Sequence, residues 1–289
     1  MRAFRCRPCR AVPVMAVQSV SRGTKPEVSG RMRELKEQNK VAFIPYLCGG
    51  DPNLEVTRKA IKILDDCQAD IIELGVPYSD PLADGPVIQS AATRALSNGT
   101  TLDGVLNMVK SVTPEISAPL VLFTYYNPVM ARGLDLFCEQ IKEAGAAGLL
   151  VPDIPLEETG DVREACAKVG LELVLLVTPT TPAERMEKIA KATEGFVYLV
   201  SVTGVTGVRT GVSDRVEGLI SDLQGLTDKP VSVGFGVSGP EQAKKLVSWG
   251  AEGVIVGSAL VRALGDAPNP EEGLQQMKEL AGSLREAIP

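Results

Sequence analysis

Eight short runs of mostly apolar residues, rich in β-branched side chains, recur along the chain, and segments with apolar positions at helical spacing separate them. The runs are Val41–Leu47, Asp70–Val76, Leu120–Tyr126, Gly148–Val151, Leu171–Val177, Phe196–Val202, Val231–Gly234 and Gly253–Val256. They are continuous rather than alternating, which is typical of parallel strands buried on both faces. Eight strands alternating with helices over about 250 residues favour a closed (β/α)8 TIM barrel over an open sheet.

Helices are predicted between these runs, each with apolar side chains gathered on one side. They cover Asn53–Cys67, Leu134–Ala144, Pro182–Thr193, Asp214–Leu226, Pro240–Trp249 and Glu271–Ile288. Gly145, Gly170 and Gly250 follow such segments, where glycine commonly ends a helix. An extra helix over Gly30–Lys40 precedes the first strand, and we expect it to cap the bottom of the barrel. The alternative, a Rossmann-like sheet, requires Gly-x-Gly-x-x-Gly after its first strand, and residues 48–52 lack it.

The N-terminal segment differs in composition from the rest of the chain. Six basic residues precede the first acidic residue, Glu27. Arginine-rich, acid-free extensions of this kind resemble organelle transit peptides, and the alternative is an ordinary disordered tail. We therefore expect a disordered tail over residues 1–27 and a barrel catalytic domain over residues 28–289. Cys6 and Cys9 form a Cys-x-x-Cys pair in the tail, which we interpret as incidental.

Composition excludes several classes of function. The chain has no histidine, which removes Ser-His-Asp triads and histidine-based metal sites, so we expect no metal and assign acid–base chemistry to other side chains. A net charge of −6 argues against a nucleic-acid-binding surface, and no apolar run approaches the ~20 residues of a membrane span. The cysteines outside the tail lie in predicted strands and helices, where we expect small buried apolar residues. They are Cys48, Cys67, Cys138 and Cys166.

Glu73 interrupts an apolar run near the end of the second predicted strand. Catalytic groups of these barrels lie at the C-terminal ends of the strands, so Glu73 should point into the barrel mouth. Desolvation there would raise its pKa and suit it to acid–base work. The alternative is a structural glutamate paired with a buried base, but none of the other seven runs contains a basic residue. The loop that follows carries Asp80 and Asp84, which by themselves suggest no more than turn formation.

Glycines recur after the sixth, seventh and eighth predicted strands, at Gly204–Gly207, Gly234–Gly236 and Gly257. Glycine lets backbone N–H groups approach an anion closely. Ser258–Arg262 reads as a short helix whose N-terminus would face that anion. A phosphate commonly binds at this end of such barrels, so the pattern predicts a phosphate-binding helix after the eighth strand.

The continuous string from Ile72 to Pro86, IELGVPYSDPLADGP, resembles the signature of tryptophan synthase α subunits. Further stretches similar to this family run through residues 28–289, among them Val151-Pro-Asp-Ile-Pro155 and Gly234-Phe-Gly-Val-Ser238. The resemblance implies that the catalytic pair is Glu73 and Asp84. Glu73 would donate and later collect a proton, and Asp84 would stay ionised and accept the indole N–H.

The resemblance also implies the remaining site residues. Substrate-binding residues would be Tyr198, Tyr46, Phe123 and Tyr125, although Tyr198 could equally be a core tyrosine. Phosphate-binding residues would be Gly207, Gly236, Gly257 and Ser258. Pro77 and Asp80 would face a partner subunit. Val202-Thr203 departs from bacterial members, many of which carry a basic residue there, and this loop looks closer to plant members.

The function implied is a lyase that cleaves indole-3-glycerol phosphate into indole and glyceraldehyde 3-phosphate, without a cofactor of its own. The implied partner is a β subunit that carries pyridoxal phosphate, in a heterotetramer. A plant-like loop together with the basic tail indicates the chloroplast. A stand-alone indole-3-glycerol-phosphate lyase with the same residues is the alternative, and a catalytically silent barrel is a third reading that the paired carboxylates disfavour.

Overall fold

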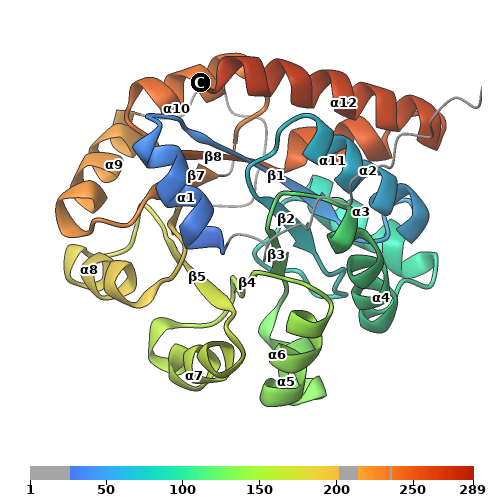
Figure 1. The fold of residues 1–289 in the computed structure, drawn as a ribbon, viewed down its shortest axis with the longest axis horizontal. Coiled ribbons are helices and arrows are strands. Elements are labelled where there is room, and N and C mark those ends of the chain that lie inside the picture. The colour runs from blue at the N-terminus through green and yellow to red at the C-terminus, as the bar shows by residue number, and fades with distance from the viewer. Residues whose placement is uncertain (1–26, 202–213, 235) are drawn as a thin grey trace, which may run out of the picture.

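The computed structural model describes residues 27–201, 214–234 and 236–289, and in them eight parallel strands close into a barrel in chain order (Figure 1). The strands are β1 (Ala42–Cys48), β2 (Ile72–Gly75), β3 (Leu120–Phe123), β4 (Gly148–Leu150), β5 (Glu172–Val177), β6 (Val197–Val200), β7 (Val231–Gly234) and β8 (Gly253–Val256). The predicted (β/α)8 barrel is therefore confirmed. Of the predicted tail, only Glu27 lies within the described residues.

Helices surround the strands. They are α1 (Val28–Glu37), α2 (Leu54–Asp66), α3 (Pro86–Ser97), α4 (Leu102–Val112), α5 (Tyr126–Arg132), α6 (Leu134–Glu143), α7 (Thr159–Val169), α8 (Ala183–Ala192), α9 (Asp214–Leu226), α10 (Pro240–Ser248), α11 (Ser258–Gly265) and α12 (Pro270–Ala287). Each predicted helix is present, and the three predicted helix-ending glycines have positive φ angles. The predicted strand Leu120–Tyr126 ends early, at Phe123, because Tyr126 begins α5. No helix of the described residues is long and apolar enough to cross a membrane.

Two apolar cores hold the barrel together. One fills the annulus between strands and helices, and Leu74 and Leu122 belong to it. The other fills the barrel interior, where Ile44, Val121 and Phe196 pack against α1. Because successive strand residues face opposite sides, six of the eight described strands contribute to both cores, and β2 and β7 contribute to the outer one.

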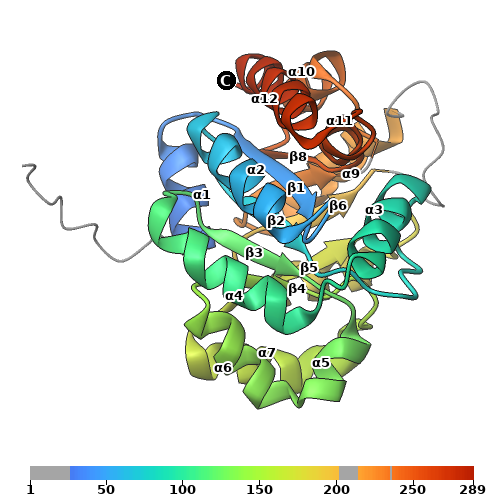
Figure 2. The ribbon, with the colours of Figure 1, turned by 90° about the vertical axis from the view of Figure 1, so that its right-hand side faces the viewer.

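Helix α1 closes the end of the barrel at which the strands begin (Figure 2). Its Val28 and Met32 are buried in the interior core, and the backbone N–H of Ser29 donates to the Glu172 carboxylate at the start of β5. A carboxylate at a helix N-terminus is stabilising because the free N–H groups there carry partial positive charge. This confirms the predicted capping helix.

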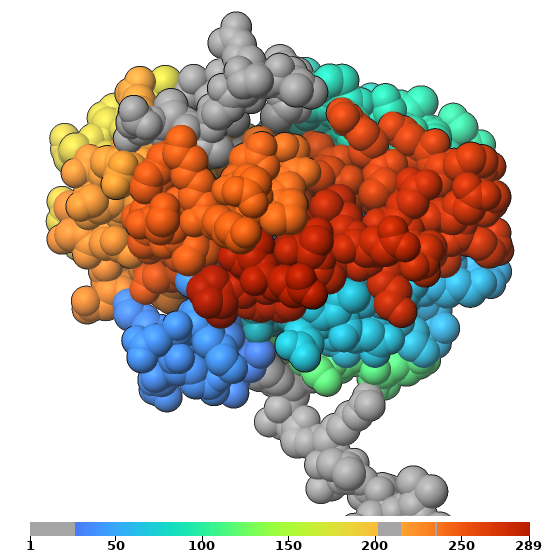
Figure 3. Space-filling view, turned by 90° about the horizontal axis from the view of Figure 1, so that it is seen from above, coloured from blue at the N-terminus to red at the C-terminus, as the bar shows by residue number. Residues whose placement is uncertain are grey.

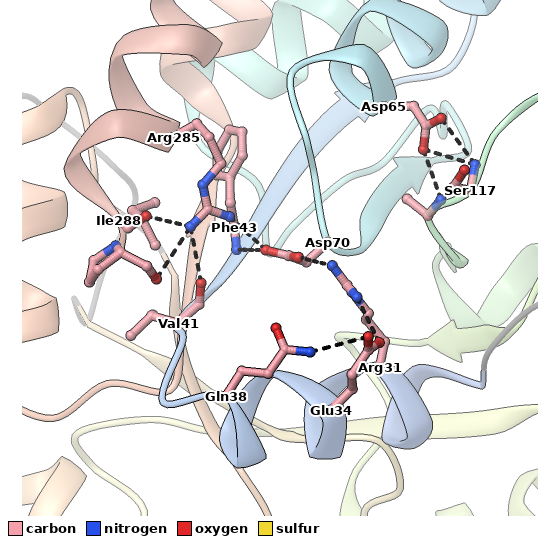
Figure 4. Close-up of polar contacts among 12 residues, drawn as sticks. Arg31, Glu34, Gln38, Val41, Phe43, Asp65, Asp70, Ser117, Arg285 and Ile288 are labelled. Carbon is pink, nitrogen blue, oxygen red and sulfur yellow. Dashed lines mark hydrogen bonds and ion pairs between the residues drawn. The ribbon is translucent and has the colours of Figure 1, made fainter.

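Asp70 ties the first and last described helices together at this same end of the barrel (Figure 4). Its carboxylate accepts hydrogen bonds from Arg31 of α1 at 2.7 Å, from Arg285 of α12 at 2.7 Å and from the Phe43 N–H of β1 at 2.8 Å. Figure 3 shows the C-terminal helices, in orange and red, next to the blue N-terminal segments that Asp70 joins to them. With the bottom closed, the opposite end of the barrel remains for a site.

Candidate active site

Glu73 points into the barrel from β2, between Tyr46 of β1 and Val121 of β3, with which it is in register. Its side chain is 1% exposed, and its Oε1 has no hydrogen-bond partner in the described part of the chain. Burial raises the pKa of Glu73 from its ordinary value to about 8, because an ionised carboxylate loses its hydration there. The predicted inward orientation is thus observed, and no described base pairs with this carboxyl.

Asp84 lies in the loop between β2 and α3 and is 7% exposed. Its backbone N–H donates to the Pro81 carbonyl at 3.0 Å, and its own carbonyl accepts from the Gln89 amide at 2.8 Å, so the loop is held from both sides. Burial raises the pKa of Asp84 to about 6, while a hydrogen bond from Tyr125 opposes the rise. At neutral pH, Asp84 is therefore mostly ionised and Glu73 mostly protonated.

Tyr125 links the Asp84 loop to the strand-three side of the barrel. Its hydroxyl accepts the Ala83 N–H at 3.0 Å and donates to the Asp84 carboxylate. Tyr125 precedes α5 as its N-cap residue rather than lying inside the strand predicted there. This interaction was not predicted, because it depends on two loops that meet only in the folded chain.

The two carboxyls belong to one site, since both act on the same tyrosines. Burial raises the pKa of Tyr198 well above its ordinary value, and the charges of Glu73 and Asp84 raise it further. Burial also raises the pKa of Tyr46, with contributions from both carboxyls and from Cys48. Glu73 and Asp84, eleven positions apart in the sequence, therefore lie within electrostatic range of the same two tyrosines.

Two glycines leave room for the hydroxyl groups of Tyr46 and Tyr198. A Cβ atom at Gly234 of β7 would overlap the Tyr198 hydroxyl, and one at Gly75 of β2 would overlap the Tyr46 hydroxyl. Both glycines are the last residues of their strands. Each phenol can therefore lie across its neighbouring strand at the level of the carboxyls.

An aromatic wall borders the carboxyls. Tyr46 meets Phe123 edge to face with 5.5 Å between ring centroids, and Phe123 meets Tyr125 in the same way at 6.4 Å. Tyr78, which was not among the predicted site residues, stacks on Tyr125 at 5.2 Å and accepts a hydrogen bond from Asn127 at 2.9 Å. Such a wall suits a flat aromatic ligand, which can pack against the rings by face or by edge.

Three of the four predicted phosphate-binding residues lie at this rim. Gly257 is the N-cap residue of α11, and Ser258 is the first residue of that helix. Gly236 follows β7, has a φ of 85° and is exposed. Gly257 lies against the Tyr46 ring, so the N-terminus of α11 borders the tyrosine that neighbours Glu73. Gly207, like Val202-Thr203, lies outside the described residues.

The predicted partner-facing residues differ in exposure. Asp80 is exposed, whereas the Pro77 side chain is buried within the chain itself. Beside Asp80, Leu82 is 80% exposed, and Met130 of α5 is 53% exposed. The hydrogen bond between Tyr78 and Asn127 holds this loop against α5, so the two apolar side chains belong to one sector of the rim.

Among residues 27–201, 214–234 and 236–289, no three His, Cys, Asp or Glu side chains gather in a group that could hold a metal ion. The site described above consists of two carboxyls, an aromatic wall and a helix N-terminus.

Comparison with known proteins identifies the family. A model of the tryptophan synthase alpha chain family matches residues 32–289. The tryptophan synthase alpha chain of Arabidopsis thaliana is 54% identical over 261 residues, which cover 90% of this chain and 95% of that one. That of Picosynechococcus is 58% identical over 261 residues, covering 90% and 98%. A solved structure of the tryptophan synthase a2b2 complex from Pyrococcus furiosus contains a chain with 39% identity and a TM-score of 0.80, covering 85% of this chain and 98% of that chain. The chain belongs to the tryptophan synthase alpha chain family, whose members are enzymes of tryptophan biosynthesis.

Proposed function

We propose that the protein cleaves indole-3-glycerol phosphate into indole and glyceraldehyde 3-phosphate at the site formed by Glu73 and Asp84. The observation that carries the proposal is the pair of buried carboxyls with different protonation states. Burial raises the pKa of Glu73 to about 8 and, against the hydrogen bond from Tyr125, that of Asp84 to about 6. One acid and one carboxylate are thus available together near pH 7.

The reaction needs two proton movements. Protonated Glu73 delivers its proton to C3 of the indole ring, which leaves the ring electron-deficient. Ionised Asp84 accepts a hydrogen bond from the indole N–H and stabilises the positive charge that develops there. Glu73, now a carboxylate, removes the proton of the side-chain hydroxyl. The C3–C3′ bond then breaks, its electron pair returns to the ring, and an aldehyde forms on the departing fragment.

Binding uses the rest of the site. The indole ring would pack against Phe123, Tyr125 and Tyr46, and the Tyr198 hydroxyl would hold the glycerol chain. The phosphate would bind at Gly236, Gly257 and Ser258, where the N–H groups of a helix start favour an anion. Gly207 would complete this set.

Glutamine at position 73 and asparagine at position 84 test these roles. We expect Glu73→Gln to lower the turnover of indole-3-glycerol phosphate about 1,000-fold, since one general acid–base group contributes about 10²–10⁴. Asp84→Asn should lower it about 100-fold, because the amide carries no charge to stabilise the ring. Asp161→Asn, an exposed carboxylate on α7, is the matched control and should turn over normally. Unchanged turnover in Glu73→Gln would refute the assignment.

We also propose that a β subunit binds at the rim that carries Asp80, Leu82 and Met130. The exposed apolar side chains there support this, as does the occurrence of a related chain in the a2b2 complex from Pyrococcus furiosus. Pro77 is buried and would fix the conformation of the loop that carries Asp80 and Leu82. Leu82→Asp should weaken binding of the β subunit at least tenfold in calorimetric titration, whereas Leu96→Asp, on α3 away from this loop, should not.

Pyridoxal phosphate would belong to the β subunit alone, and none of the eight described strands contains a lysine that could hold it as a Schiff base. A purified chain that develops the absorbance of a pyridoxal Schiff base would contradict this. Turnover measured with and without β subunit separates the subunit from a stand-alone lyase. We expect the β subunit to increase the turnover by this chain strongly. Full turnover by the isolated chain would instead favour a stand-alone lyase.

The basic N-terminal segment and the similarity to the Arabidopsis chain support a plastid location. A fusion of residues 1–27 to a fluorescent protein should enter chloroplasts. Fluorescence that stays in the cytosol would contradict this.

A further inference from the structure

Two buried cysteines face each other on the outer layer of the barrel, away from the site described above. The Cys138 Sγ of α6 and the Cys166 Sγ of α7 are 3.9 Å apart, and both side chains are 0% exposed. The other two cysteines of the described residues have different surroundings: Cys48 lies at the barrel mouth, and the Cys67 thiol contacts the Lys278 carbonyl. Only the first pair therefore brings two described sulfurs into contact.

The two helices that carry the pair are held face to face. They pack side by side around β4 (Figures 1 and 2). Lys168 of α7 pairs with Asp135 of α6 at 3.7 Å, and Lys142 of α6 donates to the Gly170 carbonyl just after α7. A disulfide requires an S–S distance of about 2.05 Å, so the sulfurs must approach by about 1.9 Å. Small rotations of two facing side chains, with a slight shift of the helices, can supply this.

We propose that Cys138 and Cys166 form an intramolecular disulfide when the protein meets hydrogen peroxide, so that α6 and α7 carry a reversible oxidation site. The proposal is independent of the reaction at the barrel mouth. Both thiols are buried, so a small peroxide reaches them more readily than a bulky disulfide compound does. We therefore name hydrogen peroxide as the oxidant.

The chemistry assigns a different task to each sulfur. Either thiol can donate to the other across this contact, and the sulfur that accepts is the more readily ionised; we assign this part to Cys138, whose pKa the hydrogen bond lowers. Its thiolate attacks one oxygen of hydrogen peroxide, breaks the O–O bond, and gives a sulfenic acid and hydroxide. Cys166 then attacks the sulfenic sulfur, the S–S bond forms, and the second oxygen leaves as hydroxide. The proton that Cys138 released on ionising and the thiol proton of Cys166 convert the two hydroxides into two waters, and the two sulfurs have lost two electrons to the peroxide.

Peptide mapping of the folded, full-length chain tests the proposal. The chain is treated with graded hydrogen peroxide, remaining thiols are alkylated in urea, and trypsin then releases residues 133–142 and 164–168 as separate peptides. We expect these two peptides joined, two hydrogens lighter than their sum, in most molecules before Cys67 is consumed. Dithiothreitol should release them. Two alkylated single peptides, or each cysteine oxidised alone to sulfinic acid, would overturn the proposal.

Controls separate native pairing from random oxidation. A chain oxidised in urea should give a mixture of links among its six cysteines, whereas in the folded chain Cys138 and Cys166 should link only to each other. Cys67→Ala should keep the link. Cys138→Ala should lose it and leave Cys166 alkylated. Oxidation should raise the melting temperature of the wild type by about 5 °C, since the bond closes a loop in the unfolded chain. It should not raise that of Cys138→Ala. If Cys138→Ala does not fold, the wild-type peptide map still decides.

Discussion

Replacing Glu73 with glutamine should make the protein more stable although it removes activity. Glu73 is 1% exposed, and its Oε1 lacks a hydrogen-bond partner among the described residues. Burial raises the pKa of Glu73 from 4.5 to about 8, so the folded chain resists its ionisation. Glutamine has nearly the same shape and never carries a charge, so it avoids that cost.

The size of the effect follows from linkage. Below pH 4.5 Glu73 is protonated in the folded and unfolded chain alike, and the two proteins should have similar stability. Between pH 4.5 and 8 the unfolded chain has lost this proton while the folded chain keeps it. The free energy of unfolding of the wild type therefore falls by about 1.4 kcal/mol per pH unit over this interval. The advantage of Glu73→Gln should reach about 3 kcal/mol at pH 7 and level off above pH 8.

Urea unfolding followed by circular dichroism measures this directly at pH 5, 7 and 8.5. The difference between Glu73→Gln and wild type should grow from under about 1 kcal/mol at pH 5 to about 3 kcal/mol at pH 7. A difference that stays constant with pH, or a glutamine variant that is less stable throughout, would refute the reasoning.

Three further substitutions probe the site and its support. Tyr125→Phe removes the hydrogen bond that holds the pKa of Asp84 down, so the acidic limb of the pH–turnover profile should move to higher pH, and an unmoved limb would contradict this. Asp70→Asn leaves Arg31 and Arg285 without their buried carboxylate, so chemical denaturation should show a free energy of unfolding lower by about 3 kcal/mol. A decrease within experimental error would show that the contact contributes little. Gly234→Ala places a methyl group where the Tyr198 hydroxyl lies, so kcat/KM should fall at least tenfold while circular dichroism stays normal. Unchanged kinetics would show that this phenol does not contribute.

The strands could be predicted because parallel strands buried on both faces need continuous apolar runs, and the chain supplies eight of them. Glu73 could be predicted for the same reason, since a carboxylate is out of place in such a run. The end of β3 was placed too late because Tyr125 and Tyr126 are good strand residues locally. Packing of the loop instead makes Tyr125 the N-cap residue of α5.

Other features depend on contacts between distant segments, which no local pattern encodes. Tyr78 and Tyr125 stack because two loops meet at the rim, so Tyr78 was missed. Gly75 does not form a turn. Its missing side chain leaves space for the Tyr46 hydroxyl of the neighbouring strand. Cys138 and Cys166 were expected to be separate apolar residues, and only the packing of α6 on α7 brings their sulfurs together.

A carbon-13 NMR titration of the side-chain carboxyls tests the central claim most directly, with Glu73→Gln and Asp84→Asn used to assign the two resonances. Glu73 should titrate with a pKa of about 8, because it is buried and its Oε1 has no partner among the described residues. Asp84 should titrate with a pKa of about 6, because the hydrogen bond from Tyr125 offsets part of the effect of its burial. Both carboxyls titrating near their ordinary values, or Asp84 titrating above Glu73, would contradict the central claim.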